Sequence, residues 1–150
     1  MRFAVDAPPA RVTFCHCRFC QRATGSAYLV EPLFEEKNFS VKTGKVRVYQ
    51  HRSTGSGKLV YIHFCENCGT KLFLTFERFA ATIGVYGGTF DDPNWFDRSS
   101  GNSKHIFMGE AQHGTIIPAG MNSFQEHAMM PDGTPIEPTL FTEPEIIKTR

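Results

Sequence analysis

Apolar and polar residues alternate over short stretches along most of the chain, and glycine, proline and asparagine separate these stretches. Short runs rich in β-branched and aromatic side chains predict strands rather than helices. The predicted strands cover residues 12–14, 27–30, 46–49, 58–64, 71–76 and 81–86, and residues 21–24 are expected to form one helical turn. The pattern therefore predicts an all-β fold of small twisted antiparallel sheets.

Two of the predicted strands form a hairpin with cysteines in its turn. The strand at 58–64 runs directly into Cys65, and the strand at 71–76 follows shortly after Cys68. Gly69 permits the tight reversal that such a turn needs. We therefore expect the two cysteines to form a metal-binding knuckle between paired strands.

From about Gly109 the alternating pattern weakens. The stretch from residue 111 carries scattered charges and five prolines: Pro118, Pro131, Pro135, Pro138 and Pro144. We predict a zinc-binding domain over residues 1–110 and an extension over residues 111–150 that wraps the same domain or is partly loose.

Composition excludes several classes of protein. A chain of 150 residues with 41% hydrophobic and 21% charged residues is typical of one globular domain with a real core. No apolar run approaches the roughly 20 residues of a membrane span, and the first residues lack a signal peptide. We therefore expect a soluble, cytoplasmic protein without a membrane partner.

Charge argues against a dedicated nucleic-acid binder, because the net charge is +1. The two parts of the chain differ, however: residues 1–60 hold ten Lys and Arg against four Asp and Glu, and the rest hold six against eleven. A basic first part would attract a small anionic substrate or a phosphate backbone. The alternative is a solvated surface that is merely uneven.

The candidate chemistry lies in five cysteines that fall into two clusters. Cys15, Cys17 and Cys20 form a CxCxxC unit, and Cys65 and Cys68 form a CxxC unit after 44 intervening residues. Such paired units in a cytosolic protein are typical of zinc sites. Residues two apart in extended chain point to the same side, so the first three thiolates can converge on one ion. The alternatives are small buried hydrophobic cysteines and a redox dithiol, although the βαβ pattern usual for the latter is missing.

Longer motifs surround both clusters. The chain reads CHCxxCQRxTGSAY from Cys15, FCxxCGTxLF from Phe64, GTFDDP from Gly88 and HIF from His105. Over roughly residues 3–110 their order and spacing resemble the glutathione-dependent formaldehyde-activating enzyme family, which includes centromere protein V. The resemblance implies a mainly β fold, bound Zn²⁺ and carbon–sulfur lyase chemistry on thiol adducts. The named reaction of the family is the reversible formation of S-(hydroxymethyl)glutathione from formaldehyde and glutathione.

The sequence departs from the family at one point. Members usually carry a Gly-x-Cys-x-Cys-Gly segment just before the strand to which residues 2–5 are expected to belong. In the family that pair of cysteines joins the later CxxC around a structural zinc, so Cys65 and Cys68 would supply half of a coordination shell here. Three explanations stay open: a start codon placed too late, an absent structural site, or one zinc shared by both clusters.

The spacing and the resemblance together assign the first three cysteines as ligands of a reactive Zn²⁺ whose fourth position is open to a thiol. His16 lies between two of these ligands and is a candidate for proton transfer. Four residues that follow the cluster are candidates for binding a substrate carboxylate: Arg22, Thr24, Gly25 and Ser26. Helix capping and turn formation are the alternative roles for the last three.

For several other residues a structural role is the simpler interpretation. His63 could replace a missing cysteine as a zinc ligand, although a half-buried surface histidine is the simpler interpretation. Asp91 and Asp92, followed by Pro93, are most simply a turn. Trp95 and Phe96 are expected in the core.

Three functions remain in view. The first is a zinc-dependent lyase acting on a glutathione-type adduct of a small aldehyde. The second is an enzyme of the same fold acting on another thiol or electrophile, and the third is a non-catalytic zinc module that binds a protein or nucleic acid. The fourth zinc position separates the enzymes from the interaction module, because the module fills it with a protein ligand and an enzyme leaves it open. The sequence fixes neither the substrate nor the oligomeric state.

Overall fold

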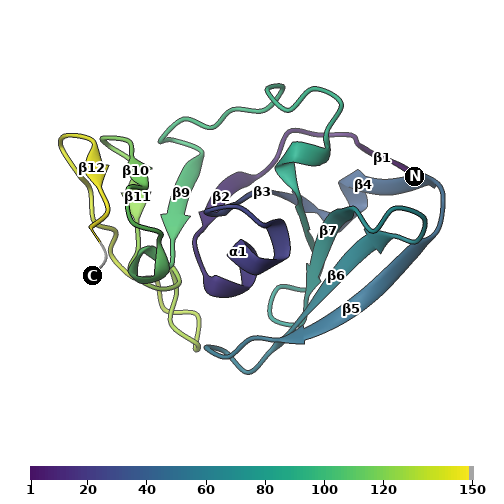
Figure 1. Ribbon diagram of the computed structural model, residues 1–150, viewed down its shortest axis with the longest axis horizontal. Coiled ribbons are helices and arrows are strands. Elements are labelled where there is room, and N and C mark those ends of the chain that lie inside the picture. Colours follow the sequence, from purple (N-terminus) through teal and green to yellow (C-terminus); the bar gives the residue numbers. More distant parts are fainter. Residues whose placement is uncertain (149–150) are drawn as a thin grey trace. The chain divides into compact units, whose positions relative to one another are not determined.

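The computed structural model describes residues 1–148 and contains two units. Unit 1 comprises Met1–Arg11 and Pro32–Phe96, and unit 2 comprises Val12–Glu31 together with the chain from Asp97. Strands dominate each unit (Figure 1), and α1 (Arg18–Thr24) is the α-helix within the described residues. The prediction of a mostly β fold built from small sheets is confirmed. No helix in residues 1–148 is both long and apolar enough to span a bilayer.

Unit 1 holds an antiparallel sheet and a smaller two-stranded sheet. The larger one has the order β3-β8-β7-β6-β5, and β5, β6 and β7 lie side by side in Figure 1. Its strands are β3 (Leu29–Glu35, in this unit from Pro32), β5 (Val46–Arg52), β6 (Leu59–Cys65), β7 (Lys71–Phe76) and β8 (Thr82–Val85). The smaller sheet pairs β1 (Arg2–Val5) with β4 (Phe39–Thr43). Two short 3₁₀ turns, η1 (Glu36–Asn38) and η2 (Gly87–Thr89), complete the unit.

The β6–β7 hairpin confirms the prediction of a cysteine-bearing turn. Its register pairs Ile62 with Leu74, which are both buried. At the turn, the N–H of Gly69 donates to the carbonyl oxygen of Cys65 at 2.9 Å. Gly69 has a φ of +72°, a left-handed conformation that glycine adopts without a steric penalty.

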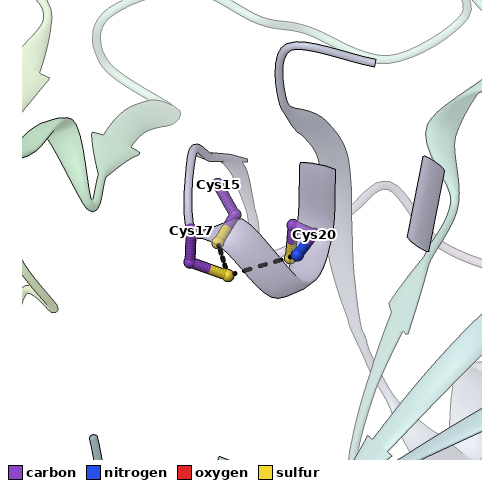
Figure 2. A group of neighbouring side chains, drawn as sticks. All are labelled: Cys15, Cys17 and Cys20. Carbon is purple, nitrogen blue, oxygen red and sulfur yellow. Dashed lines mark hydrogen bonds between the residues drawn. The ribbon is translucent and has the colours of Figure 1, made fainter. Parts of the chain in front are cut away.

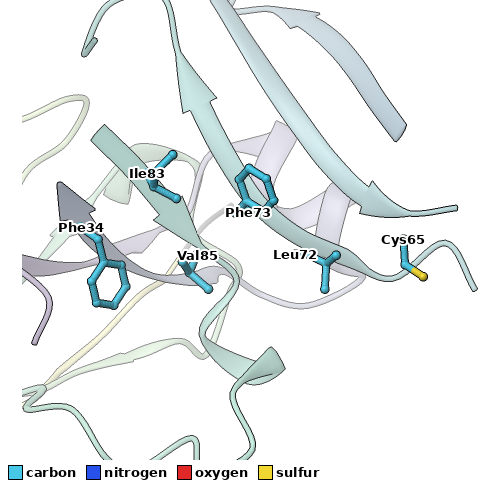
Figure 3. Packing of buried hydrophobic residues seen from close by; sticks show 6 residues of the cluster. All are labelled: Phe34, Cys65, Leu72, Phe73, Ile83 and Val85. Atoms are coloured by element: carbon cyan, nitrogen blue, oxygen red, sulfur yellow. The ribbon is translucent and has the colours of Figure 1, made fainter. Parts of the chain in front are cut away.

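The core of unit 1 is a cluster of buried side chains from these strands (Figure 3). Its buried members are Phe34, Cys65, Leu72, Phe73, Ile83 and Val85. Ile83 and Val85 are alternate residues of β8 and share one of its faces, whereas Leu72 and Phe73 are consecutive, so β7 is buried on both faces. Phe96 is buried as expected, whereas Trp95 is 39% exposed and stacks on Phe34. The core expectation for Trp95 is therefore wrong.

Unit 2 contains parallel strands, which the hairpin pattern does not predict. β2 (Arg11–Cys15, in this unit from Val12) pairs in parallel with β9 (Ser103–Ile106), and β9 pairs in parallel with β11 (Asn122–Ser123). η3 (Met108–Glu110) follows β9, and β10 (Ile116–Ile117) pairs antiparallel with β12 (Glu145–Ile146). Ile117 and Met121 are buried in a small core with Met108. The expected boundary near residue 110 stays a prediction.

Candidate metal centre

Three cysteines converge where β2 ends and α1 begins (Figure 2). Cys15 is the last residue of β2, Cys17 is the N-cap of α1, and Cys20 lies in its first turn. Their sulfur atoms all lie within 4.8 Å of one another, and the Sγ atoms of Cys15 and Cys17 are 3.5 Å apart. Thiolates bound tetrahedrally to one Zn²⁺ at about 2.3 Å lie about 3.8 Å from each other. The three residues are therefore arranged as a group that could hold a metal ion.

The local sequence explains this convergence. Cys17 has an extended backbone, and its Sγ accepts a hydrogen bond from the N–H of Cys20 at 3.4 Å. A sulfur thus takes the place that a hydroxyl or carboxylate oxygen occupies at most helix starts. The helix ends at Gly25, whose φ is +69° and whose N–H donates to the carbonyl oxygen of Gln21 at 2.8 Å. The helical turn expected at 21–24 is confirmed but begins earlier, because the thiol cap was not anticipated.

The three thiols differ in acidity. Hydrogen bonds from the thiols of Cys15 and Cys20 lower the pKa of Cys17 to about 3. The pKa of Cys15 is raised well above its ordinary value, first because its proton is bonded to Cys17 and then because the group is buried. The pKa of Cys20 is raised in the same way, first by hydrogen bonding to Cys15 and Cys17 and then by burial. Without metal, the site at neutral pH is therefore one thiolate stabilised by two neutral thiols.

His16 is fully buried in the loop between two of the cysteines. Its Nε2 lies 2.9 Å from Nδ1 of His105, so one ring donates a proton to the other, and the two rings stack at 5.2 Å. Burial lowers the pKa of each ring to about 4, so both are neutral at pH 7. Within residues 1–148, His16 Nδ1 and His105 Nε2 have no hydrogen-bond partner. Sequence reasoning missed this pairing, although His105 belongs to the HIF motif.

Three of the four residues proposed for substrate binding make structural hydrogen bonds around the helix end. Thr24 Oγ1 donates to the carbonyl oxygen of Cys20 at 2.8 Å and accepts from the N–H of Ser26 at 3.2 Å. Gly25 closes the helix, while Arg22 and Ser26 are exposed. The capping roles are therefore present, and carboxylate binding by these residues stays a prediction.

Cys65 and Cys68 belong to unit 1, at the β6–β7 turn. Cys65 is buried and Cys68 is exposed, and all five cysteines of the chain are free thiols. Hydrogen bonding to Thr70, whose Oγ1 is 3.2 Å from the sulfur, lowers the pKa of Cys68 to about 7. His63 is engaged elsewhere, with its Nε2 3.0 Å from Thr75 Oγ1. In the described part of the chain only the first three cysteines form a group that could hold a metal ion, so metal binding at Cys65 and Cys68 stays a prediction.

The GTFDDP motif lies in unit 1 and borders a cavity of about 320 Å³. Asp91 accepts two hydrogen bonds from Arg2 Nη1, at 2.8 and 3.1 Å, in an exposed ion pair. Asp92 Oδ1 accepts from the N–H of Asn94 at 2.9 Å, which forms the expected turn. The cavity is lined by Met1, Arg2, Phe3, Leu72, Thr89, Phe90, Asp91, Asp92 and Trp95.

Comparison with known proteins gives the family of the chain. The family model of the glutathione-dependent formaldehyde-activating enzyme matches residues 1–110, which include β2, α1 and the cysteines of both units. Comparison with individually curated proteins gives no match. The match spans well over half of the sequence and agrees with the resemblance carried by the motifs. The chain belongs to the glutathione-dependent formaldehyde-activating enzyme family.

Proposed function

We propose that this protein is a zinc-dependent carbon–sulfur lyase that acts on the adduct of a glutathione-type thiol with a small aldehyde. The observation that carries the proposal is the group of three thiols at the start of α1, in a chain of this family. Three ligands leave one position of a four-coordinate ion open, as in catalytic rather than structural zinc sites. The five free thiols suit the reducing cytoplasm, where we place the protein.

The donor set fits a soft metal ion. The group consists of sulfur atoms alone, and thiolates select Zn²⁺ over Mg²⁺ or Ca²⁺, which prefer oxygen ligands. In this proposal Cys15, Cys17 and Cys20 hold the ion. When bound, Zn²⁺ supplies a positive charge that stabilises a thiolate in the open position.

The reaction requires that one proton be moved within the site. A carbon–sulfur bond forms between the thiol and the aldehyde carbon, and the thiol proton ends on the aldehyde oxygen, so no proton is consumed overall. We assign His16 as the group that holds this proton. Its ring is neutral at pH 7 because burial lowers its pKa to about 4, and its Nδ1 has no hydrogen-bond partner within residues 1–148. The assignment predicts that His16→Gln lowers kcat as much as His16→Phe, because the amide of glutamine stays polar but cannot take up the proton.

Substrate recognition is assigned to the end of α1. Arg22 is exposed in the last turn, and its guanidinium can pair with a carboxylate of the thiol substrate. The C-terminal end of a helix repels anions, so the attraction must come from this side chain rather than from the backbone around Gly25. Thr24 and Ser26 would supply neutral hydrogen bonds beside it. Arg22→Ala should raise KM for the thiol with little change in kcat, and Arg22→Lys should lie between it and the wild type.

The open position can be tested directly with Co²⁺ in place of Zn²⁺. Addition of glutathione should change the visible absorption of the Co²⁺ protein, because a fourth sulfur enters the coordination sphere. S-methylglutathione, which has no free thiol, is the matched control and should leave the spectrum unchanged. A spectrum that no thiol alters would contradict the proposed lyase activity. It would favour an interaction module in which the protein supplies the fourth ligand. If other small thiols change the spectrum but glutathione does not, the open metal position is supported and glutathione is rejected as the substrate.

A further inference from the structure

The side chain of Gln21 is buried in α1, and all of its hydrogen-bonding capacity is used. Nε2 donates to the carbonyl oxygen of His16 at 2.5 Å and to that of Glu110 at 2.8 Å. Oε1 accepts from Arg18 Nη1 at 2.5 Å and from Gln112 Nε2 at 3.1 Å. A primary amide has two N–H donors and two acceptor lone pairs, so this side chain is saturated in a single orientation.

These contacts fix the chain on both sides of Cys17. The carbonyl group of His16 belongs to the peptide that leads into Cys17, and Gln21 holds it. The N–H of Arg18, directly after Cys17, donates to Glu110 Oε2 at 2.5 Å. N–H groups in the first turn of a helix lack partners within the helix, and a carboxylate there is favoured by the helix dipole. The peptides before and after the central thiol are therefore both restrained.

The restraints come from one firmly anchored segment. Glu110 ends η3, where the N–H groups of Met108 and Gly109 donate to the carbonyl oxygens of Phe124 and Gln125 at 3.0 and 3.1 Å. The residue before η3, Phe107, has a φ of +58°, which is strained for a side chain of its size. Such strain persists where the surrounding contacts over-determine the backbone. The segment is thus built to hold a fixed position against the cysteine loop.

We propose that Gln21 and Glu110 are positioning residues that hold the loop from Cys15 to Cys20 in its ligand arrangement before a metal ion arrives. The proposal rests on the metal site assigned above to the three cysteines. Neither side chain is one of the proposed ligands. A loop that is already ordered loses less conformational entropy on binding, so its affinity for the ion is higher.

Metal affinity gives the first test. Gln21→Met keeps the length of the side chain and removes all four hydrogen bonds, and Gln50→Met, at an exposed position of β5 in unit 1, is the matched control. Co²⁺ affinity is measured by competition with a chelator. Gln21→Met should bind Co²⁺ about 10- to 100-fold more weakly than the wild type, the range found for groups that orient metal ligands, and Gln50→Met should bind normally. Equal affinity in Gln21→Met and the wild type would overturn the proposal.

Hydrogen exchange of the metal-free protein gives a test that does not depend on metal. Glu110→Leu removes the acceptor of the Arg18 N–H, whereas Glu110→Gln keeps one. The Arg18 amide should exchange at least about tenfold faster in Glu110→Leu and nearly normally in Glu110→Gln, with β6 amides as the reference for intact folding. Failure of the wild type to bind Co²⁺ while exchange behaves as expected would reject the metal site alone. An unchanged exchange rate of the Arg18 amide in both variants would reject the positioning role. If Gln21→Met does not fold, the comparison of Glu110→Leu with Glu110→Gln tests the proposal by itself.

Discussion

Loading the metal-free protein with Zn²⁺ at pH 6 should release two protons per ion, although three thiols become ligands. Hydrogen bonding lowers the pKa of Cys17 to about 3, so this group is already a thiolate at pH 6. The pKa values of Cys15 and Cys20 are raised well above the ordinary value, so both carry a proton that the ion must displace. His16 adds none, because its pKa of about 4 leaves it neutral before and after binding.

The proton count sets the pH dependence of metal affinity. Each displaced proton makes the affinity tenfold higher per pH unit, so two protons give about 100-fold, or about 2.7 kcal/mol per pH unit. This slope holds between the lowered pKa of Cys17 and the raised pKa values of its neighbours. The affinity for Zn²⁺ therefore falls steeply as the pH decreases from 8 to about 5. Below the pKa of Cys17 this thiol is also protonated, so binding there displaces three protons and the affinity depends on pH still more steeply.

Calorimetry in buffers of different ionisation enthalpy counts these protons. The chain for this experiment carries Cys65→Ala and Cys68→Ala, so that the three thiols of unit 2 are its only cysteines. Two protons per Zn²⁺ are expected. A count of three would refute the assignment of Cys17 as a preformed thiolate, and a count near zero would refute coordination by these thiols.

Three further substitutions test the packing and turn arguments by chemical denaturation. Ile62→Ala should lower the free energy of unfolding by about 2–5 kcal/mol, because the side chain is 1% exposed and its removal leaves a cavity. Gly25→Ala should cost about 1 kcal/mol, since no atom lies within 4 Å of the added Cβ and only the left-handed backbone is penalised. A loss far above that would point to an unrecognised contact. Asp91→Ala should leave stability unchanged within error, because its ion pair with Arg2 is exposed to solvent and salt.

The parts of the site that depend on local spacing could be predicted from the sequence. Cys15, Cys17 and Cys20 are close in the chain, so the extended residue pair and the following turn suffice to bring their sulfurs together. The β6–β7 hairpin follows in the same way from two alternating runs and Gly69. The assignment of Cys65 and Cys68 as metal ligands depends on partners that local spacing does not define.

The parts that depend on distant segments could not be predicted. β2 pairs in parallel with β9, and parallel pairing leaves no hairpin signal because the connection between the strands is long. This pairing brings His105 to His16, and η3, which follows β9, brings Glu110 to the helix start. Gln21 was visible in the CQR part of the motif, but its role lies in contacts with Glu110 and Gln112 that no local pattern encodes.

The central claim is that three cysteines of unit 2 hold a reactive Zn²⁺ that catalyses thiol–aldehyde exchange. Two-dimensional exchange NMR of formaldehyde and glutathione, with and without the zinc-loaded protein, measures it directly. The account predicts faster exchange with the wild type, no acceleration with Cys17→Ser, and retained acceleration with the control Gln50→Met. Exchange that stays at the uncatalysed rate with the zinc-loaded wild type, or full acceleration by Cys17→Ser, would contradict it.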